Sequence, residues 1–423
     1  MRMGGAMKRP LQPPTAPSTM PLMKPATLVN HPPQVPLPAD NHPLVAPIHQ
    51  SVKFEFDTVE EAQRHFRGER PGFFYQRTSN PTTRQLELTL AGLQGREEAI
   101  ACASGVAAIN GTLLALTRQG DHVLCFVETY GPTRQFIRRS LARFGVRHTM
   151  LSIEDLAGAQ RVLAATPTRL MIFESPTNPL NKIADLAALC ALARHYGALT
   201  VLDNTFAGLH QHGQFEIDYY VHSLTKYAAG HGDVMGGAVI ASAALLAPLR
   251  AEFTLLGGTL DPHAAFLVQR GLKTYMLRYV AQSASAQRVA EALSTMGDVS
   301  RMGAASTAGA ITRVHYPGLT THPQHRLARA QMSEFGAVVS FDLRAGAEAG
   351  RQFAEALQLF AIAASLGATE SLVIPPQMMG TRDLSDEERA LSGIGPGTVR
   401  LSIGLEDVDD LLADIAQALE SIA

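Results

Sequence analysis

The sequence contains few cysteines, few charged residues and no long apolar run. Its three cysteines, Cys102, Cys125 and Cys190, lie far apart within apolar stretches, which excludes a disulfide framework and a Cys-x-x-Cys metal site. We therefore expect buried, reduced thiols. Charged residues make up 17% of the 423 residues, and 36 Lys and Arg nearly balance 38 Asp and Glu. The net charge of −2 gives no electrostatic reason to bind nucleic acid or an acidic membrane.

Signatures of several other ligand classes are also missing. The 15 histidines form no H-E-x-x-H or similar cluster, so no metal site is predicted. Residues 393–397 lack the spacing of a dinucleotide fingerprint, and residues 271–274 lack the frame of a P-loop. No apolar run approaches the roughly 20 residues that span a bilayer, and the N-terminus lacks a signal-peptide core. We expect a cytoplasmic protein that acts on a small molecule, without metal, nucleic-acid or membrane partners.

Proline is concentrated at the start of the chain. Residues 1–48 hold 12 of the 25 prolines, and this density excludes a sustained helix or an inner strand. We predict a disordered arm over residues 1–48. The length of the whole chain predicts two or three domains.

After about residue 80, short apolar runs alternate with helical stretches. This alternation predicts a mostly parallel sheet covered on both faces, with the ligand beyond the carboxyl ends of the strands. The predicted strands are residues 122–127, 170–173, 199–202 and 234–241, and the predicted helices are residues 105–116, 133–144 and 183–195.

The last third of the chain has a different pattern. A long helix is predicted over residues 262–293, followed by half-buried strands over residues 338–343 and 399–403. Apolar residues at helical spacing predict a final helix over residues 407–421. These elements indicate a smaller α+β domain.

Lys226 is the first candidate for chemistry. It follows the apolar run 217–221 and precedes the Gly-rich stretch 230–237. A lysine at a strand end suits attack on an aldehyde cofactor, and the neighbouring hydroxyls of Ser223 and Thr225 suit a phosphate. When this segment is considered alone, the alternative interpretation of Lys226 is a surface lysine in a turn.

Three further strings fit the same cofactor chemistry. Asp203 ends an apolar strand and is placed to keep the ring nitrogen of pyridoxal 5′-phosphate (PLP) protonated. Asn178, in a loop with two prolines, could bond the ring hydroxyl. Ser104 and Gly105 open a helix whose N-terminus can cradle a phosphate. Each string alone also fits a turn or a helix cap.

Taken together, these strings resemble the Cys/Met-metabolism family of PLP enzymes, the trans-sulfuration enzymes of fold type I. The resemblance extends from about residue 47 to the C-terminus. It implies a seven-stranded, mostly parallel sheet in a PLP-binding α/β domain over residues 77–272 and a C-terminal α+β domain over residues 273–423. It also implies an arm over residues 49–76 that contacts the neighbouring subunit. The strings that carry it are YQRTSNPT (75–82), ASGVAAI (103–109), ETYGPT (128–133), ESPTNP (174–179), LDNTF (202–206), SLTKYAAGHGDVMGG (223–237), SLGATESL (365–372) and VRLSIGLED (399–407).

The resemblance implies a role for each cofactor-site residue. Lys226 attaches to the cofactor and later moves the α and β protons. Asp203 pairs with the ring nitrogen, Asn178 with the ring hydroxyl, and Tyr130 stacks on the ring and joins Lys226 as a catalytic residue. The phosphate is held by Ser104, Gly105, Val106, Ser223 and Thr225, and by Tyr75 and Arg77 of a neighbouring subunit. The expected assembly is a homotetramer, a pair of active dimers.

The resemblance also implies a substrate site. Arg400 grips the substrate α-carboxylate, a task that suits a guanidinium, and Ser365 and Tyr75 lie beside the substrate. The local pattern agrees, because the strand that contains Arg400 alternates so that Arg400 and Ser402 face away from its apolar side. The alternative interpretation of Arg400 is an exposed arginine on a strand.

Three positions depart from the patterns of single subfamilies. Ala364 replaces a glutamate found in many cystathionine γ-synthases and γ-lyases. The segment around Pro132 lacks the cysteine that is common in methionine γ-lyases. Leu366 stands where cystathionine β-lyases often carry tryptophan. We expect cleavage of the C–S bond of cystathionine or a related sulfur amino acid by β- or γ-elimination. The alternatives are γ-replacement on an O-acylhomoserine, a less favoured methionine γ-lyase, a cofactor-bound protein without turnover, and a dinucleotide-dependent oxidoreductase.

Overall fold

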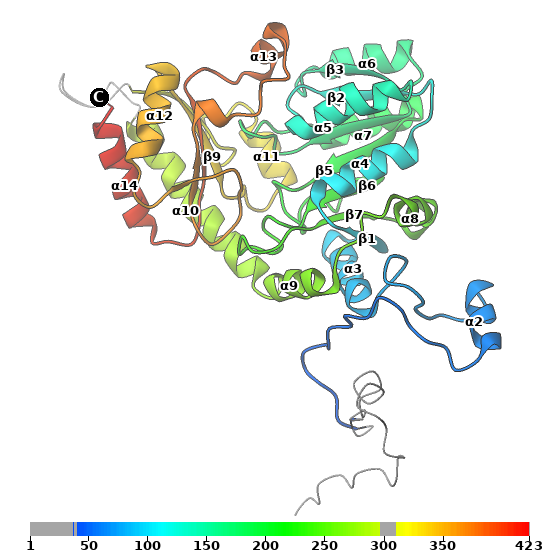
Figure 1. Ribbon diagram of the computed structural model, residues 1–423. Helices are drawn as coiled ribbons and strands as arrows, with labels where there is room; N and C mark the ends of the chain where they lie inside the picture. The colour runs from blue at the N-terminus through cyan, green and yellow to red at the C-terminus, as the bar shows by residue number, and fades with distance from the viewer. Residues whose placement is uncertain (1–36, 38–39, 297–309, 423) are drawn as a thin grey trace, which may run out of the picture. The chain divides into compact units, whose positions relative to one another are not determined.

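The computed structural model describes residues 37, 40–296 and 310–422, and Ile48–Ala423 form one compact unit (Figure 1). Of the predicted disordered arm, residues 1–36, 38 and 39 lie outside the described residues. The boundary expected at residue 272 lies within the compact unit and stays a prediction. None of the described helices is long and apolar enough to cross a membrane.

A seven-stranded sheet forms the larger part of the fold, in the order β1-β7-β6-β5-β4-β2-β3. Strand β7 is antiparallel to both of its neighbours, and the other pairs are parallel. The predicted mostly parallel, seven-stranded sheet is thus confirmed. Its strands are β1 Glu98–Cys102, β2 His122–Phe126, β3 Arg147–Leu151, β4 Leu170–Glu174, β5 Leu199–Asp203, β6 Tyr219–Ser223 and β7 Gly237–Ala241.

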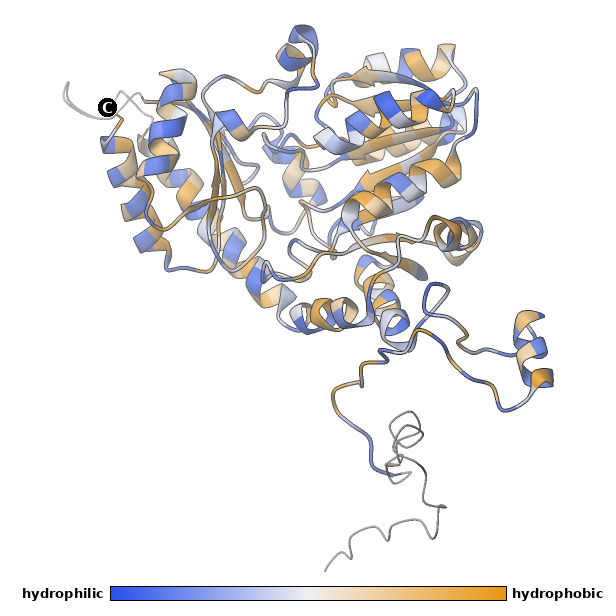
Figure 2. Cartoon of the chain, viewed as in Figure 1, coloured by the Kyte–Doolittle hydropathy of each residue, from blue (hydrophilic) through white to orange (hydrophobic). Residues whose placement is uncertain are grey.

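Helices cover both faces of this sheet because its strands are apolar on both sides (Figure 2). In β2, Leu124 and Phe126 pack into one cluster, and Val123 and Cys125 pack into the other. The first cluster includes α3 (Pro81–Gln94), α6 (Leu156–Ala165) and α7 (Leu186–Tyr196), and the second includes α4 (Gly105–Leu116), the π-helix η1 (Phe136–Leu141) and α8 (Ala243–Leu256). All three cysteines are buried free thiols, as expected.

A five-stranded sheet forms the C-terminal part, in the order β10-β11-β12-β9-β8. Helices α10, α12 and α14 pack against this sheet or against one another (Figure 1). The elements are β8 Ile311–His315, β9 Val338–Leu343, β10 Ala361–Ile362, β11 Leu372–Ile374, β12 Thr398–Ser402, α10 Tyr275–Met296, α11 His325–Gln331, α12 Gly346–Ala356, α13 Asp386–Ser392, α14 Val408–Glu420 and the 3-10 turn η3 Pro376–Met378. The remaining helices are α2 Val59–Phe66, α5 Gly131–Gln135 and α9 Pro262–Leu272.

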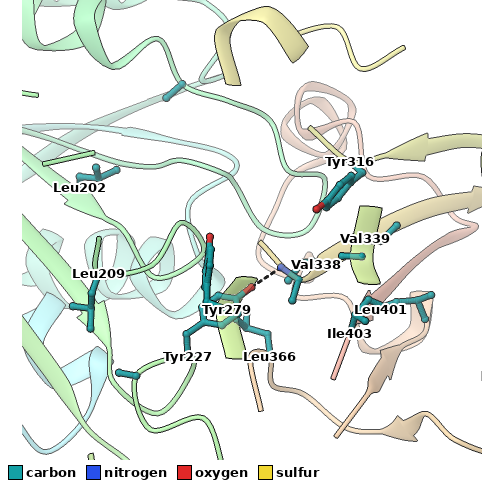
Figure 3. Packing of buried hydrophobic residues seen from close by; sticks show 14 of the residues in the cluster. Leu202, Leu209, Tyr227, Tyr279, Tyr316, Val338, Val339, Leu366, Leu401 and Ile403 are labelled. Carbon is teal, nitrogen blue, oxygen red and sulfur yellow. Dashed lines mark hydrogen bonds between the residues drawn. The ribbon is translucent and has the colours of Figure 1, made fainter. Parts of the chain in front are cut away.

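Buried tyrosines connect the large sheet to the small one. Tyr227, which follows Lys226, accepts a hydrogen bond on its hydroxyl from the amide of Ala337 at 2.8 Å. Tyr279 of α10 packs edge-on against Tyr227, with ring centroids 4.9 Å apart. Figure 3 shows both rings close to Leu366 and Val338. These contacts fix the backbone beside Lys226 to the C-terminal sheet.

Two predicted elements have different bounds in the structure. The single helix predicted over residues 262–293 is wrong, because α9 ends at Leu272 and α10 begins at Tyr275. Near the end of α9, Gly271 packs directly on the backbone of Ala229. A Cβ on Gly271 would be only 2.2 Å from the Ala229 carbonyl oxygen. The strand predicted from residue 234 begins only at Gly237, because the preceding amide, that of Gly236, donates to Thr225 Oγ1 at 3.1 Å.

Two further predictions need correction. The helix predicted over residues 133–144 begins at Gly131 as α5 and continues as the π-helix η1. The strands predicted over residues 338–343 and 399–403 are not half-buried, since each residue of β12 and every residue of β9 except Asp342 is buried. Val399 and Leu401 face the hydrophobic core, as the alternation predicts, while Arg400 faces a cavity rather than solvent.

Candidate active site

A cavity of about 720 Å³ lies at the carboxyl ends of the parallel strands. The residues that end β4, β5 and β6, namely Glu174, Asp203 and Ser223, all line it. This is the position that the predicted topology gives for a ligand. The volume is in the upper part of the range of about 300–1,000 Å³ for ligand pockets. The predicted site residues that line the cavity are Ser104, Gly105, Val106, Tyr130, Asn178, Asp203, Ser223, Thr225, Lys226, Ser365 and Arg400.

Lys226 is fixed in the cavity by Ser365. The Lys226 ammonium donates a hydrogen bond to Ser365 Oγ at 3.0 Å, although the two residues are 139 positions apart. The pKa of Lys226 is lowered to about 8, chiefly by burial and also by the positive charge of Arg400, while the charge of Asp203 acts in the opposite direction. About a tenth of the amine is therefore neutral, and thus nucleophilic, at pH 7, far more than in an unperturbed lysine.

The lowered pKa of Lys226 predicts how the cofactor-free protein captures an aldehyde. Because only the neutral amine attacks, the capture rate should rise with pH and level off above about 8, rather than rise toward the ordinary value of 10.5. Arg400→Met removes a positive charge and should move the midpoint to higher pH. Stopped-flow absorbance with PLP measures the rate. Arg389→Met, in an exposed residue, should leave the midpoint unchanged, and a wild-type midpoint above 10 would contradict the expectation.

Two carboxylates, the buried Glu174 and the partly buried Asp203, lie side by side at the ends of β4 and β5. Glu174 and Asp203 are register partners, and both line the cavity. Burial raises the pKa of both groups, and the charge of Asp203 raises the pKa of Glu174 further. Thr205 favours the charged form of Asp203 by donating hydrogen bonds from its hydroxyl at 2.6 Å and its amide at 3.1 Å. Asp203 is thus the carboxylate suited to a cationic ring nitrogen, and Glu174 accepts from the Tyr130 amide.

The start of α4 forms a cradle next to Ser223. Ser104 caps the helix by accepting from the Ala107 amide at 3.0 Å, so the first amides of α4 face outward with the positive end of the helix dipole. A Cβ on Gly105 would lie 2.8 Å from the Ser223 Cβ, so the space requires glycine. Exposed amides, a hydroxyl and space without a side chain fit a phosphate. Together with a nucleophilic lysine and a buried carboxylate, this set of groups fits PLP.

Arg400 is a buried cation with an unused donor. Only 5% of the residue is exposed, and burial lowers its pKa to about 10. Its Nη1 donates to Asn178 Oδ1 at 2.9 Å, and its Nη2 donates to the Ser365 carbonyl at 2.7 Å. Its buried Nε has no hydrogen-bond partner among the described residues. A buried, underused guanidinium fits a carboxylate ligand, whereas the ring-hydroxyl role of Asn178 stays a prediction.

Tyr130 lies at the open side of the cavity, while Tyr75 and Arg77 lie outside it. Tyr130 is 42% exposed, as a residue that closes over a ligand would be. The Arg77 guanidinium donates to the Thr254 carbonyl at 3.1 Å and lies 5.7 Å from the centre of the Tyr75 ring. Within one chain, these two side chains do not join Lys226. Their predicted task in a neighbouring subunit stays a prediction.

Several residues of the cavity wall were not predicted from the sequence. Thr205 bonds Asp203, and Arg134 forms a buried ion pair with Asp383 at 2.8 Å. Arg382 lines the cavity from the same segment as Asp383. The Asp-x-Thr spacing of an Asx turn could have indicated Thr205. No local pattern indicates Arg134, because its partner is 249 residues away.

Comparison with known proteins agrees with this site. The sequence profile of the Cys/Met metabolism PLP-dependent enzymes matches residues 27–420. The chain belongs to this family. An L-methionine gamma-lyase of Pseudomonas putida is 44% identical over 385 residues, 90% of this chain and 93% of that protein. An O-succinylhomoserine sulfhydrylase of Pseudomonas aeruginosa is 39% identical over 371 residues, 87% of this chain and 89% of that protein.

Solved structures agree as well. The crystal structure of a cystathionine gamma synthase from Xanthomonas oryzae pv. oryzae in complex with cystathionine superimposes with a TM-score of 0.80 at 36% identity, covering 89% of this chain and 92% of that one. The expected fold type I, the family and the PLP-dependent enzyme class are therefore confirmed. The placing of methionine γ-lyase below the other activities is not supported, because a relative with that name is 44% identical.

Proposed function

We propose that the protein cleaves the C–S bond of cystathionine or a related sulfur amino acid by γ-elimination. One observation carries the proposal: Ser365 hydrogen-bonds both to Lys226, the base that moves the proton, and to Arg400, which binds the substrate carboxylate. Its Oγ accepts from the Lys226 amine at 3.0 Å, and its carbonyl accepts from Arg400 at 2.7 Å. A substrate held by its α-carboxylate on Arg400 therefore presents its α-proton to Lys226. The γ-position is supported by the gamma-lyase and gamma-synthase names of the relatives.

Different residues of the cavity perform different steps of the proposed reaction. Bound PLP supplies an electron sink for the charge left when the α-proton is removed. Lys226 takes the α-proton, since its lowered pKa of about 8 suits a base near neutral pH. Asp203, whose charged form is favoured by hydrogen bonds from Thr205, would stabilise a protonated ring nitrogen. Lys226 would then take a proton from Cβ, so that the Cγ–S bond breaks with its electron pair on sulfur, which gains a proton and leaves as a thiol. Hydrolysis of the remaining four-carbon unit gives 2-oxobutyrate and ammonia.

An apolar part of the cavity wall suits a thioether. These apolar residues line the same cavity as Lys226. Apolar and polarizable side chains contact a thioether without an unpaired polar group. Its residues are Met235, Ala364, Leu366, Ile374, Met378 and Met379.

γ-Replacement on an O-acylhomoserine is the second candidate. It shares the first proton transfers and differs only in that a second nucleophile adds after the leaving group departs. The O-succinylhomoserine sulfhydrylase and the cystathionine gamma synthase among the similar proteins favour it. The residues of the cavity serve both reactions.

Product analysis tests the proposal. PLP-loaded protein incubated with L-cystathionine should release 2-oxobutyrate and cysteine in equal amounts, measured by chromatography of the derivatised products. Pyruvate with homocysteine would instead mean cleavage at Cβ and would overturn γ-elimination. Consumption of O-succinylhomoserine only when a thiol is supplied, with no keto acid from cystathionine or methionine, would assign γ-replacement.

We further propose that Tyr75 and Arg77 complete the phosphate site of a neighbouring subunit in a homotetramer. Both side chains lie outside the cavity of their own chain, and Tyr75 is 39% exposed. Subunits of the inactive variants Arg77→Ala and Lys226→Ala, once mixed and allowed to exchange, should regain activity because some sites combine intact halves. No regain after exchange, with mixed oligomers present by native mass spectrometry, would contradict the shared site.

A further inference from the structure

The cavity has one more basic side chain than the proposed chemistry uses. Four basic residues line it: Arg134, Lys226, Arg382 and Arg400. Arg134 is neutralised by its buried ion pair with Asp383. Lys226 serves the cofactor and Arg400 the α-carboxylate. Arg382 is exposed, and the structure gives it no hydrogen bond or ion pair with any described residue.

The backbone that carries Arg382 is nonetheless fixed in place. Arg134 donates to the Gly380 carbonyl at 2.8 Å and to both carboxylate oxygens of Asp383 at 2.8 and 2.9 Å. The Leu384 side chain is buried, and its amide donates to the Thr381 carbonyl at 3.1 Å. The residues on both sides of Arg382 are thus anchored, while its guanidinium is free to bind a ligand.

Arg382 and Arg400 reach the cavity from different parts of its wall. Arg400 extends from β12 and is held by Asn178 and Ser365. The segment that carries Arg382 packs on α5, where the Gly380 carbonyl lies 3.3 Å from the position of a Cβ on Gly131. The apolar residues Met378 and Met379 precede Arg382 in this segment and line the same cavity. The matching ligand has a carboxylate at each end of a mostly apolar chain.

We propose that Arg382 binds the distal carboxylate of the substrate. The substrate class is then an amino acid with a second carboxylate beyond the bond that breaks, such as cystathionine or a succinyl ester of homoserine, in preference to methionine. The inference rests on the proposed function, since it assumes the α-carboxylate on Arg400. A guanidinium suits this task, because its planar donors can bond both oxygens of a carboxylate.

A matched pair of ligands tests this assignment. O-succinylhomoserine and O-acetylhomoserine share the amino-acid part and the ester, but only the succinyl compound has a distal carboxylate. Isothermal titration of the PLP-loaded protein, carried out in the Lys226→Ala background so that neither ester reacts, should show about 10–100-fold tighter binding of the succinyl ester. Arg382→Gln should remove this preference and leave the acetyl ester unchanged. Arg389→Gln, an exposed arginine of α13, should keep it.

Kinetics on reacting protein gives a second, separate readout. Arg382→Gln should lower kcat/KM for cystathionine about 10–100-fold, mainly through KM, and change the value for methionine less than about threefold. A preference for the succinyl ester that survives Arg382→Gln, or an equal loss on both substrates, would overturn the assignment. A protein that binds the esters as expected but releases no keto acid would contradict the proposed function and leave the role of Arg382 supported.

Discussion

Replacing Lys226 by alanine is expected to abolish turnover. The variant loses the amine that attaches to the cofactor and the base that moves the α-proton. Loss of proton transfer alone costs about 10²–10⁴-fold in rate, and loss of attachment adds to that. Steady-state release of keto acid from the PLP-loaded variant measures the effect. Since Lys226 packs only partly into the core, the variant should fold normally, which circular dichroism checks.

A second lysine provides the control for Lys226→Ala. Lys273 is exposed at the end of α9 and does not line the cavity. Lys273→Ala should keep wild-type kcat and KM. If Lys226→Ala retained more than about a tenth of wild-type activity, Lys226 would not be the base, because such a small loss is below the contribution of general base catalysis.

Replacing Arg134 by methionine is expected to destabilise the fold strongly. The side chains of Arg134 and Asp383 are only 5% and 8% exposed. Arg134 also donates to the carbonyls of Val127, Thr129 and Gly380. Removing one partner of a buried ion pair leaves an uncompensated charge and costs about 3–5 kcal/mol. Equilibrium denaturation in urea should show this loss in the free energy of unfolding.

Two further variants separate the ion pair from other effects of Arg134→Met. Arg288→Met breaks an exposed pair with Asp409, whose side chains are 51% and 74% exposed, and should cost less than about 1 kcal/mol. Adding Asp383→Leu to Arg134→Met removes the unpaired carboxylate and should recover part of the lost stability. An Arg134→Met protein as stable as wild type would show that the pair does not hold the Arg382 segment.

The sequence predicted β2, β4, β5 and β7 of the large sheet because these buried strands are continuous apolar runs, whereas β1 and β3 were not among the predicted strands. The helix predicted over residues 105–116 matches α4 at both ends, where Ser104 supplies an N-cap that the sequence makes visible. The single helix predicted over residues 262–293 is divided into α9 and α10, and the residues just before the break make a tertiary contact. Gly271 packs against the backbone of Ala229 there, which no local pattern reports.

The sequence located most of the candidate site but not all of it. Lys226, Asp203 and Ser223 were found because each lies at or just beyond the end of a recognisable apolar strand. Arg134 and Arg382 were missed because their significance depends on the chain bringing the segment before α13 back to α5 and η1. Pairings of this kind across some 250 residues follow from the tertiary fold rather than from spacing in the sequence.

Chemical trapping tests most directly whether Lys226 holds the cofactor in this cavity. The protein is loaded with PLP, reduced with borohydride, digested, and the modified peptide identified by mass spectrometry. We expect one modified peptide, carrying the cofactor on Lys226 at about one equivalent per chain. Label on a different lysine, or none above the background seen with Lys226→Ala, would contradict the assignment of the site and the function proposed from it.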